Sequence, residues 1–224
     1  MELLRTLEEK VDPSCAAVMV IDMQNDFCSE GGFLDQLGVE LGPIQAIVPT
    51  IRRLLESARE HGVTVLHAYY DGDPRFFLAP MLERLERKNE AEPYCVPGTW
   101  GIEIVQDLKP EDGELVIGKH RYSAFFGTDL DMHLKANGIK TLILCGTATN
   151  NCVDGTGRDA FYNGYYVVLP SDASAAPTDE LHRATLQTAD HAYGVVASTD
   201  EIVSIWNGAT GREAAAVLAE TGAA

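Results

Sequence analysis

Short, largely apolar segments rich in valine, isoleucine and leucine alternate along the chain with longer amphipathic segments. A short segment that is apolar at nearly every position is typical of a strand with both faces covered, because a half-exposed strand would alternate with polar residues. The pattern therefore predicts six buried strands, at residues 16–21, 63–68, 114–117, 141–145, 165–169 and 194–197.

The amphipathic segments predict helices over residues 43–61, 130–137, 151–163 and 178–191. Three of these end in a glycine that stands directly before the next strand: Gly62, Gly138 and Gly164. Glycine at this point can adopt the left-handed conformation that ends a helix. This alternation predicts an α/β fold, a three-layer, doubly wound, mostly parallel sheet of about six strands with helices on both faces.

Residues 71–113 break this regularity with four prolines, Pro74, Pro80, Pro93 and Pro97. We expect one charged helix at 81–89 inside a long excursion that forms a wall or lid of a site. No repeat or low-complexity linker divides the sequence, so residues 1–224 are expected to form a single domain. The alanine-rich segment 211–224 is expected to be a terminal helix that frays or packs on a neighbouring subunit.

The amino-acid composition excludes several classes of binding partner and structural site. The chain has 17 Lys and Arg against 34 Asp and Glu, a net charge of −17. Such a surface repels phosphate backbones, so nucleic acid is not an expected partner. The five cysteines form no CxxC pair, which argues against a disulfide scaffold or a zinc knuckle. Without a signal sequence or an apolar run long enough to cross a bilayer, we expect a cytoplasmic protein with no membrane partner.

Candidate chemistry lies where the predicted strands end, since ligands of open parallel sheets bind beyond the carboxyl ends of the strands. Asp22 follows the first strand, Lys119 follows the third, and Cys152 follows the strand at 141–145 close to a helix start. A helix N-terminus favours a thiolate, a carboxylate can accept the thiol proton, and an ammonium favours both anions. Together they predict a nucleophilic site.

Each of these residues also has an ordinary structural explanation. Asp22 could form a turn or cap, and Asp26 competes with it as the carboxylate. Lys119 could be a solvated surface lysine. Cys152 could be a small buried apolar residue, as we expect of Cys145 inside its strand. Because all three groups are expected at one edge of the sheet, we favour a catalytic role over these separate structural explanations.

Three segments, IDMQNDF, GKHRYSAFFGTDLDMHL and GTATNNCVDGTGRDAFYNGY, resemble in order the motifs of the isochorismatase-like cysteine hydrolases, over nearly the whole domain. The resemblance implies that Asp22, Lys119 and Cys152 form a catalytic triad. It also implies a cis peptide between Thr147 and Ala148, with the N–H groups of Ala148 and Cys152 forming an oxyanion hole.

Within that family the chain is most similar to the branch that acts on ureido and carbamoyl compounds: ureidoacrylate amidohydrolases, N-carbamoylsarcosine amidases, and biuret and triuret hydrolases. This implies that Phe27 and Tyr122 contact the substrate, although both could be ordinary core residues. Tyr70 matches a further pocket position, where ureidoacrylate relatives carry a polar residue. Arg121 could pair with a substrate carboxylate or form a surface salt bridge, and Trp100 is expected to pack the excursion against the pocket rim.

The resemblance implies hydrolysis of a C–N bond in a small linear amide or ureide through a thioester-type intermediate, with ammonia or an amine released. No cofactor and no metal are expected, since the six histidines show no metal-ligand spacing. Two alternatives are vinyl-ether hydrolysis of isochorismate, disfavoured by the presence of Cys152, and a catalytically silent interaction module. A homo-oligomer, a dimer or tetramer, is also implied.

The charge and the candidate site together predict how charge is distributed over the molecule. Acidic residues should lie on the outer helix faces, and a locally positive pocket should surround the site. The substrate is then expected to be neutral or to carry one anionic group.

Overall fold

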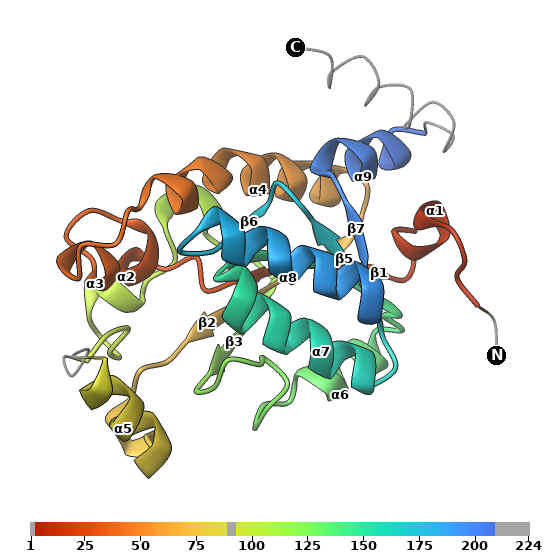
Figure 1. The fold of residues 1–224 in the computed structure, drawn as a ribbon. Helices are drawn as coiled ribbons and strands as arrows, with labels where there is room; N and C mark the ends of the chain where they lie inside the picture. The colour runs from red at the N-terminus through yellow and green to blue at the C-terminus, as the bar shows by residue number, and fades with distance from the viewer. Residues whose placement is uncertain (1–2, 89–92, 209–224) are drawn as a thin grey trace.

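A sheet of parallel strands lies between two layers of helices in the computed structural model (Figure 1). The structure describes residues 3–88 and 93–208, so the helix expected at 211–224 lies outside the described residues. The strands are β1 (Ala16–Ile21), β2 (Thr64–Tyr70), β3 (Leu115–Lys119), β4 (Thr141–Thr147), β5 (Tyr166–Pro170), β6 (Ser174–Ala175) and β7 (Val195–Ala197).

Long helices fill the predicted crossovers, and short ones cluster near the ends of strands. The α-helices are α1 (Leu7–Lys10), α2 (Asn25–Cys28), α3 (Phe33–Gln36), α4 (Gly42–Glu60), α5 (Ala79–Arg87), α6 (Leu130–Ala136), α7 (Asp154–Tyr162), α8 (Asp179–Ala192) and α9 (Thr199–Trp206). A π turn, Thr149–Val153, leads into α7, and 3₁₀ turns lie at Pro74–Phe76, Trp100–Ile102 and Gln106–Leu108.

The strand order confirms the predicted α/β architecture. The main path through the sheet is β3-β2-β1-β4-β5-β7, all neighbours are parallel, and β6 pairs with the end of β4. The chain builds outward from β1 to β3 on one side, then crosses to β4 and continues on the other. At such a reversal the two connections leave in opposite directions, which opens a crevice at the carboxyl ends of β1 and β4.

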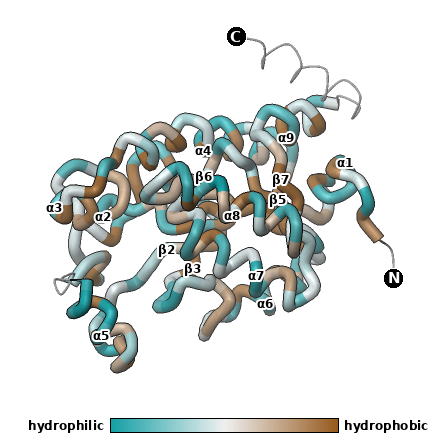
Figure 2. The backbone as a smooth tube through the Cα atoms, in the orientation of Figure 1, coloured by the Kyte–Doolittle hydropathy of each residue, from teal (hydrophilic) through white to brown (hydrophobic). Residues whose placement is uncertain are grey.

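The central strand β1 is buried on both faces. Ala16, Val18 and Val20 pack in a cluster with residues of α4 and α9. The alternate residues of the strand pack on the other face with residues of α6, α7 and α8. Figure 2 shows the corresponding contrast between hydrophobic central strands and more hydrophilic outer helices. Because both faces of β1 are buried, its sequence is an uninterrupted apolar run.

Three strands extend further toward the site than the apolar pattern predicted. β2 ends at Tyr70, β3 at Lys119 and β4 at Thr147. Tyr70 and Lys119 are register partners, so ladder pairing continues after the apolar residues stop. The two-residue strand β6 gave no signal in the sequence. The expected left-handed glycines are confirmed, with φ of 72° at Gly62, 69° at Gly138 and 91° at Gly164.

Candidate active site

The three residues predicted from the strand ends meet in the crevice between β1 and β4. Lys119 Nζ lies 2.7 Å from Asp22 Oδ2, and both side chains are buried. Cys152, only 9% exposed, lies close enough to influence the ionisation of both. A carboxylate, an ammonium and a thiol from three separate segments therefore share one nearly dry site.

Asp22 occupies a sharp turn directly after β1. Its φ of 54° is left-handed, a region that aspartate tolerates better than most residues. The turn is held by a hydrogen bond from the Asp22 N–H to the Ala68 carbonyl oxygen, 2.9 Å away. Asp22 is thus both a turn residue and a site residue, so its two interpretations from sequence do not compete.

The carboxylate and the ammonium stabilise each other against burial. Burial raises the pKa of Asp22, and the positive charge of Lys119 opposes that rise only in part. Burial alone would lower the pKa of Lys119, but Asp22 and Cys152 outweigh it, and the Lys119 pKa is raised. Lys119 therefore stays protonated through the neutral range, whereas Asp22 binds a proton more readily than an exposed aspartate.

The Cys152 thiol differs from the expectation of a stabilised thiolate. Burial and then the negative charge of Asp22 raise its pKa, and the opposing effect of Lys119 is smaller. The thiol is therefore neutral at rest, because desolvation outweighs the positive charge beside it. Asp22 Oδ1 accepts no hydrogen bond within the described part of the chain, which leaves it available to take a proton.

The turn before Cys152 has the cis peptide that the resemblance implied, between Thr147 and Ala148. The next residue, Thr149, is held by a histidine far away in the sequence. Thr149 Oγ1 lies 2.9 Å from His182 Nδ1, and His182 Nε2 lies 3.1 Å from the Ser171 carbonyl oxygen. Sequence reasoning missed His182, because nothing near it in the chain indicates that α8 packs on this turn.

Gly146 allows the two central strands to approach closely at this point. Its φ is 117°, and a Cβ atom there would lie 2.1 Å from the Ile21 carbonyl oxygen. A side chain does not fit that space, so the position requires glycine. The close approach places the turn that carries Cys152 beside the turn that carries Asp22.

A cavity of about 330 Å³ opens in front of these groups. Asp22, Cys152 and the Thr147–Ala148 turn form its reactive end. The Ala148 N–H donates to no backbone carbonyl oxygen of residues 3–88 and 93–208. An oxyanion hole needs such an uncommitted donor. The predicted substrate-contact residues all line the same cavity: Phe27, Tyr70 and Tyr122.

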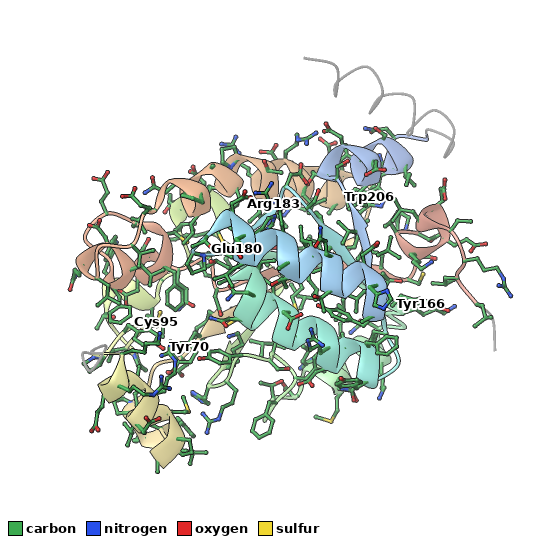
Figure 3. The ribbon with its side chains drawn as sticks, viewed as in Figure 1. Tyr70, Cys95, Tyr166, Glu180, Arg183 and Trp206 are labelled. Atoms are coloured by element: carbon green, nitrogen blue, oxygen red, sulfur yellow. The ribbon has the colours of Figure 1, made fainter. Side chains whose placement is uncertain are left out.

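Tyr94 is a cavity residue that the sequence did not reveal. It stacks on Phe33 at 4.4 Å and on Tyr70 at 5.3 Å between ring centroids, and Lys119 Nζ lies 5.5 Å from the Tyr70 ring. Phe27 meets Tyr94 edge-on at 5.8 Å, so it both packs and lines the cavity. Figure 3 shows Tyr70 and the neighbouring Cys95 lying between α5 and the α2–α3 region.

The polar residues of IDMQNDF bind the excursion to the sheet. Gln24 Nε2 donates to the carbonyl oxygens of Tyr70 and Ile102, each at 2.9 Å. Asp26 accepts hydrogen bonds from the N–H groups of Phe33 at 3.2 Å and Cys95 at 2.6 Å. Asp26 is therefore committed to holding the loop that carries Tyr94, and it does not compete with Asp22.

Two further expectations need correction. The Trp100 side chain is 51% exposed and lines no part of the cavity; instead its carbonyl oxygen accepts a hydrogen bond from Asn25 Nδ2. Of the two alternatives for Arg121, the surface salt bridge is wrong: its guanidinium donates to the carbonyl oxygens of His120 and Phe76 and pairs with no described carboxylate. The proline-rich segment 71–113, which carries Trp100, has no periodicity from which side-chain directions can be predicted.

Among the described residues, no three His, Cys, Asp or Glu side chains are grouped so that they could hold a metal ion. The same part of the chain contains no helix that is both long and apolar enough to cross a membrane.

Comparison with known proteins identifies the family. The family model of the isochorismatase domain matches residues 16–201. The chain is 35% identical over 199 residues to the ureidoacrylate amidohydrolase RutB of Methylobacterium radiotolerans, covering 83% of this chain and 77% of that protein.

Solved structures give the same result. A cysteine hydrolase of Pseudomonas syringae pv. phaseolicola superposes with a TM-score of 0.79 at 28% identity, covering 94% of this chain and 99% of that one. The N-carbamoylsarcosine amidase of Thermoplasma acidophilum superposes with a TM-score of 0.69 at 30% identity, covering 83% and 97%.

Proposed function

The chain belongs to the isochorismatase-like family of cysteine hydrolases, and on that premise we propose that it hydrolyses a C–N bond of a small linear ureide or amide. The observation that supports this most directly is the buried Asp22–Lys119 pair beside Cys152. Similarity to the ureidoacrylate amidohydrolase and the N-carbamoylsarcosine amidase supports the ureide class.

The first half of the reaction forms a covalent intermediate. Asp22 accepts the thiol proton as Cys152 Sγ attacks the carbonyl carbon, so a neutral resting thiol is activated only when substrate is in place. The N–H groups of Ala148 and Cys152 stabilise the oxyanion. Asp22 then protonates the leaving nitrogen, ammonia departs, and a thioester or thiocarbamate remains on Cys152.

The second half releases the product. Asp22, again ionised, takes a proton from a water molecule, which attacks the carbonyl carbon of the intermediate. The C–S bond breaks, and the proton returns to the sulfur. Lys119 stays charged throughout, because its raised pKa keeps the ammonium beside Asp22 in either half of the cycle. Its role is to hold the carboxylate and limit the electrostatic cost of each proton transfer.

The test compares wild type with Cys152→Ala and Cys152→Ser in ammonia release across a panel of ureides and linear amides. We expect kcat to fall by more than about a thousandfold in Cys152→Ala, because no nucleophile remains. Cys145→Ala is the matched control, since Cys145 is buried in β4 but lines no part of the cavity. Undiminished turnover by Cys152→Ala would contradict the mechanism.

Two other activities are separate outcomes of the same assay. Pyruvate release from isochorismate would identify a vinyl-ether hydrolase. A silent interaction module would release neither product from any substrate, but the 2.7 Å contact between Lys119 and Asp22 favours an enzyme over this alternative. A homo-oligomer remains our expectation, to be measured by light scattering.

A further inference from the structure

A histidine of α8 reaches the turn that carries the proposed oxyanion hole. Helix α8 packs on β6 and on the π turn Thr149–Val153. His182 lies near the start of α8, 33 residues after Thr149 in the chain, and its Nδ1 lies 2.9 Å from Thr149 Oγ1. The other ring nitrogen, Nε2, lies 3.1 Å from the Ser171 carbonyl oxygen. One imidazole therefore joins the turn before Cys152 to the segment that follows β5.

The partner of Nε2 decides which ring nitrogen carries the proton. A carbonyl oxygen accepts hydrogen bonds but cannot donate one, so Nε2 must carry a hydrogen and donate it to Ser171. In the neutral imidazole Nδ1 is then an acceptor, and the Thr149 hydroxyl donates to it. Both bonds thus have a fixed direction: Thr149 donates to His182, and His182 donates to Ser171.

This chain of hydrogen bonds fixes the residue next to a proposed oxyanion donor. Thr149 directly follows Ala148, and it is fully buried, so its hydroxyl cannot exchange His182 for bulk water without moving the turn. The inner side of the same turn is held by backbone bonds: the Ala148 carbonyl oxygen accepts from the N–H groups of Asn151 at 3.0 Å and Val153 at 3.3 Å. His182 supplies the side-chain anchor on the other side.

We propose that His182 is a positioning residue of the reaction: through Thr149 it holds the turn in the orientation that points the Ala148 N–H at the developing oxyanion. The inference rests on the proposed function, because attack on a carbonyl group is what produces the oxyanion. His182 does not line the reactive cavity, so it acts through the turn and does not contact the substrate. An oxyanion donor is effective only at hydrogen-bond distance from the place where the charge develops.

The kinetic signature of this role depends on when the oxyanion forms. The substrate carbonyl is neutral when it binds, and negative charge develops on its oxygen only during attack. A misaligned donor therefore weakens the transition state more than the bound substrate, so kcat falls and KM changes little. Removing one oxyanion donor outright costs about a hundred- to a thousandfold in kcat, and a misaligned donor should cost less.

The experiment replaces His182 with leucine, which has no hydrogen-bonding group, and with glutamine. The glutamine side chain can accept from Thr149 through Oε1 and donate to Ser171 through Nε2. We expect His182→Leu to lower kcat for the best ureide by about ten- to a hundredfold with KM within about threefold, and His182→Gln to recover most of that loss. Each kcat is divided by the folded fraction from urea unfolding, so a loss of stability alone does not change it.

His191→Leu is the matched control. His191 lies in the last turn of the same helix and is exposed. This variant should keep the kcat of wild type. If kcat per folded molecule is the same in His182→Leu as in wild type, or if His182→Gln is as slow as His182→Leu, the positioning role is wrong.

Variants of Thr149 test the same bond from its other end. Thr149→Val removes the hydroxyl with little change in shape and should lower kcat by a factor similar to that of His182→Leu, whereas Thr149→Ser keeps the hydroxyl and should retain most of the rate. The double variant Thr149→Val/His182→Leu should lose no more than either single variant, because both remove one bond. Losses that multiply would contradict a shared role.

Binding of an aldehyde separates failure of this inference from failure of the proposed function. Propanal needs no C–N bond to break: Cys152 Sγ bonds to the carbonyl carbon, and the thiol proton passes to the carbonyl oxygen. The product is the thiohemiacetal CH₃CH₂–CH(OH)–S–Cys, whose oxygen occupies the proposed oxyanion hole. We expect the calorimetric affinity for propanal to fall by about tenfold in His182→Leu and to recover in His182→Gln.

The two failures then give different results. If no ureide is hydrolysed but propanal binding follows this pattern, the proposed function is wrong and the positioning role stands. If ureides are hydrolysed and the His182 variants match wild type in both kcat and propanal affinity, the function stands and the positioning role is wrong. Equal or undetectable propanal binding in all variants, without ureide hydrolysis, would overturn both.

Discussion

Lys119 is the residue on which the charge balance of the site depends. It is the largest fully buried side chain of the described structure, and its ammonium contacts Asp22 Oδ2 and the Arg121 carbonyl oxygen, 3.0 Å away. A buried pair contributes little net stability compared with apolar residues, but removing one partner leaves an uncompensated charge. The two effects can be separated by mutation.

We expect Lys119→Met to abolish ammonia release and to lower the free energy of unfolding by about 3–5 kcal/mol, because Asp22 loses its counter-charge. The double variant Asp22→Asn/Lys119→Met should be equally inactive but clearly more stable than Lys119→Met, as measured by urea unfolding. Lys109→Met is the control, because Lys109 is exposed and its contact with Glu103 is long, at 3.8 Å. A double variant no more stable than the single one would contradict the pairing argument.

The raised pKa of Asp22 predicts the pH profile of the reaction. Asp22 must be ionised to accept the thiol proton, so kcat/KM should fall as the pH is lowered through its pKa. Because burial raises that pKa, the acid limb should lie at higher pH than the ordinary value of about 4 for aspartate. The measurement is kcat/KM as a function of pH, from about pH 3 to 9, with a neutral substrate and at constant ionic strength.

The same profile also tests the neutral resting thiol. A Cys152 thiol with a raised pKa should give no ascending limb near the ordinary cysteine value of about 8.5. A single acid limb with a plateau above it is the expected result. An acid limb at or below pH 4 would contradict the raised pKa of Asp22, and a second rise near pH 8.5 would show that Cys152 ionises before substrate binds.

At the scale of elements, the excursion between β2 and β3 is part of the site because the turn after β1 holds it there. Gln24, Asn25 and Asp26 each bond to backbone groups of that excursion. Aromatic packing through Phe33, Tyr94 and Tyr70 continues the contact into the cavity. The motif IDMQNDF thus supplies one catalytic candidate and the anchors of the opposite wall.

We expect Asp26→Ala to raise KM several-fold with a smaller change in kcat, because the loop carrying Tyr94 loses its anchor while Asp22 and Cys152 keep theirs. The unpaired Cys95 N–H should also lower the free energy of unfolding by about 1–3 kcal/mol. Asp35→Ala removes a similar bond, to the exposed Gly31 N–H at 2.7 Å, and should change neither KM nor kcat. A kcat loss as large as that of Asp22→Asn would instead assign Asp26 to the chemistry.

At the scale of the whole molecule, acidic residues lie on exposed helix faces, as the sequence suggested. Acidic residues on outer helix faces pair one turn away with basic ones, for example Arg52 with Glu56 and Arg183 with Asp179. Such exposed pairs contribute little stability, since water and salt screen them. The excess of acids sets the field that an approaching substrate meets.

Salt should therefore change the kinetics of charged and neutral substrates differently. Between about 10 mM and 300 mM NaCl the Debye length falls from about 30 Å to less than 8 Å, so long-range repulsion by the acidic surface fades. We expect kcat/KM for a ureido acid to rise by about twofold or more, and that for the matched neutral amide to stay constant. A fall for the acid would contradict long-range repulsion by the acidic surface.

How much was predictable differs between the elements of the fold. Buried parallel strands were found because both faces of β1 and β4 are covered, which leaves continuous apolar runs. The ends of β2 and β3 were placed too early, because pairing continues through polar residues such as Lys119. The short helices α2 and α3 depend on contacts with the excursion and have no periodicity of their own.

The sequence by itself determined the α/β architecture, the strand ends that carry Asp22, Lys119 and Cys152, and the family. These depend on patterns and motifs that are local in the chain. Only the tertiary structure decided that the thiol is neutral and that Tyr94 and His182 support the site. Desolvation, aromatic stacking and the local electric field depend on which distant segments pack together. That packing cannot be predicted from a local pattern in the sequence.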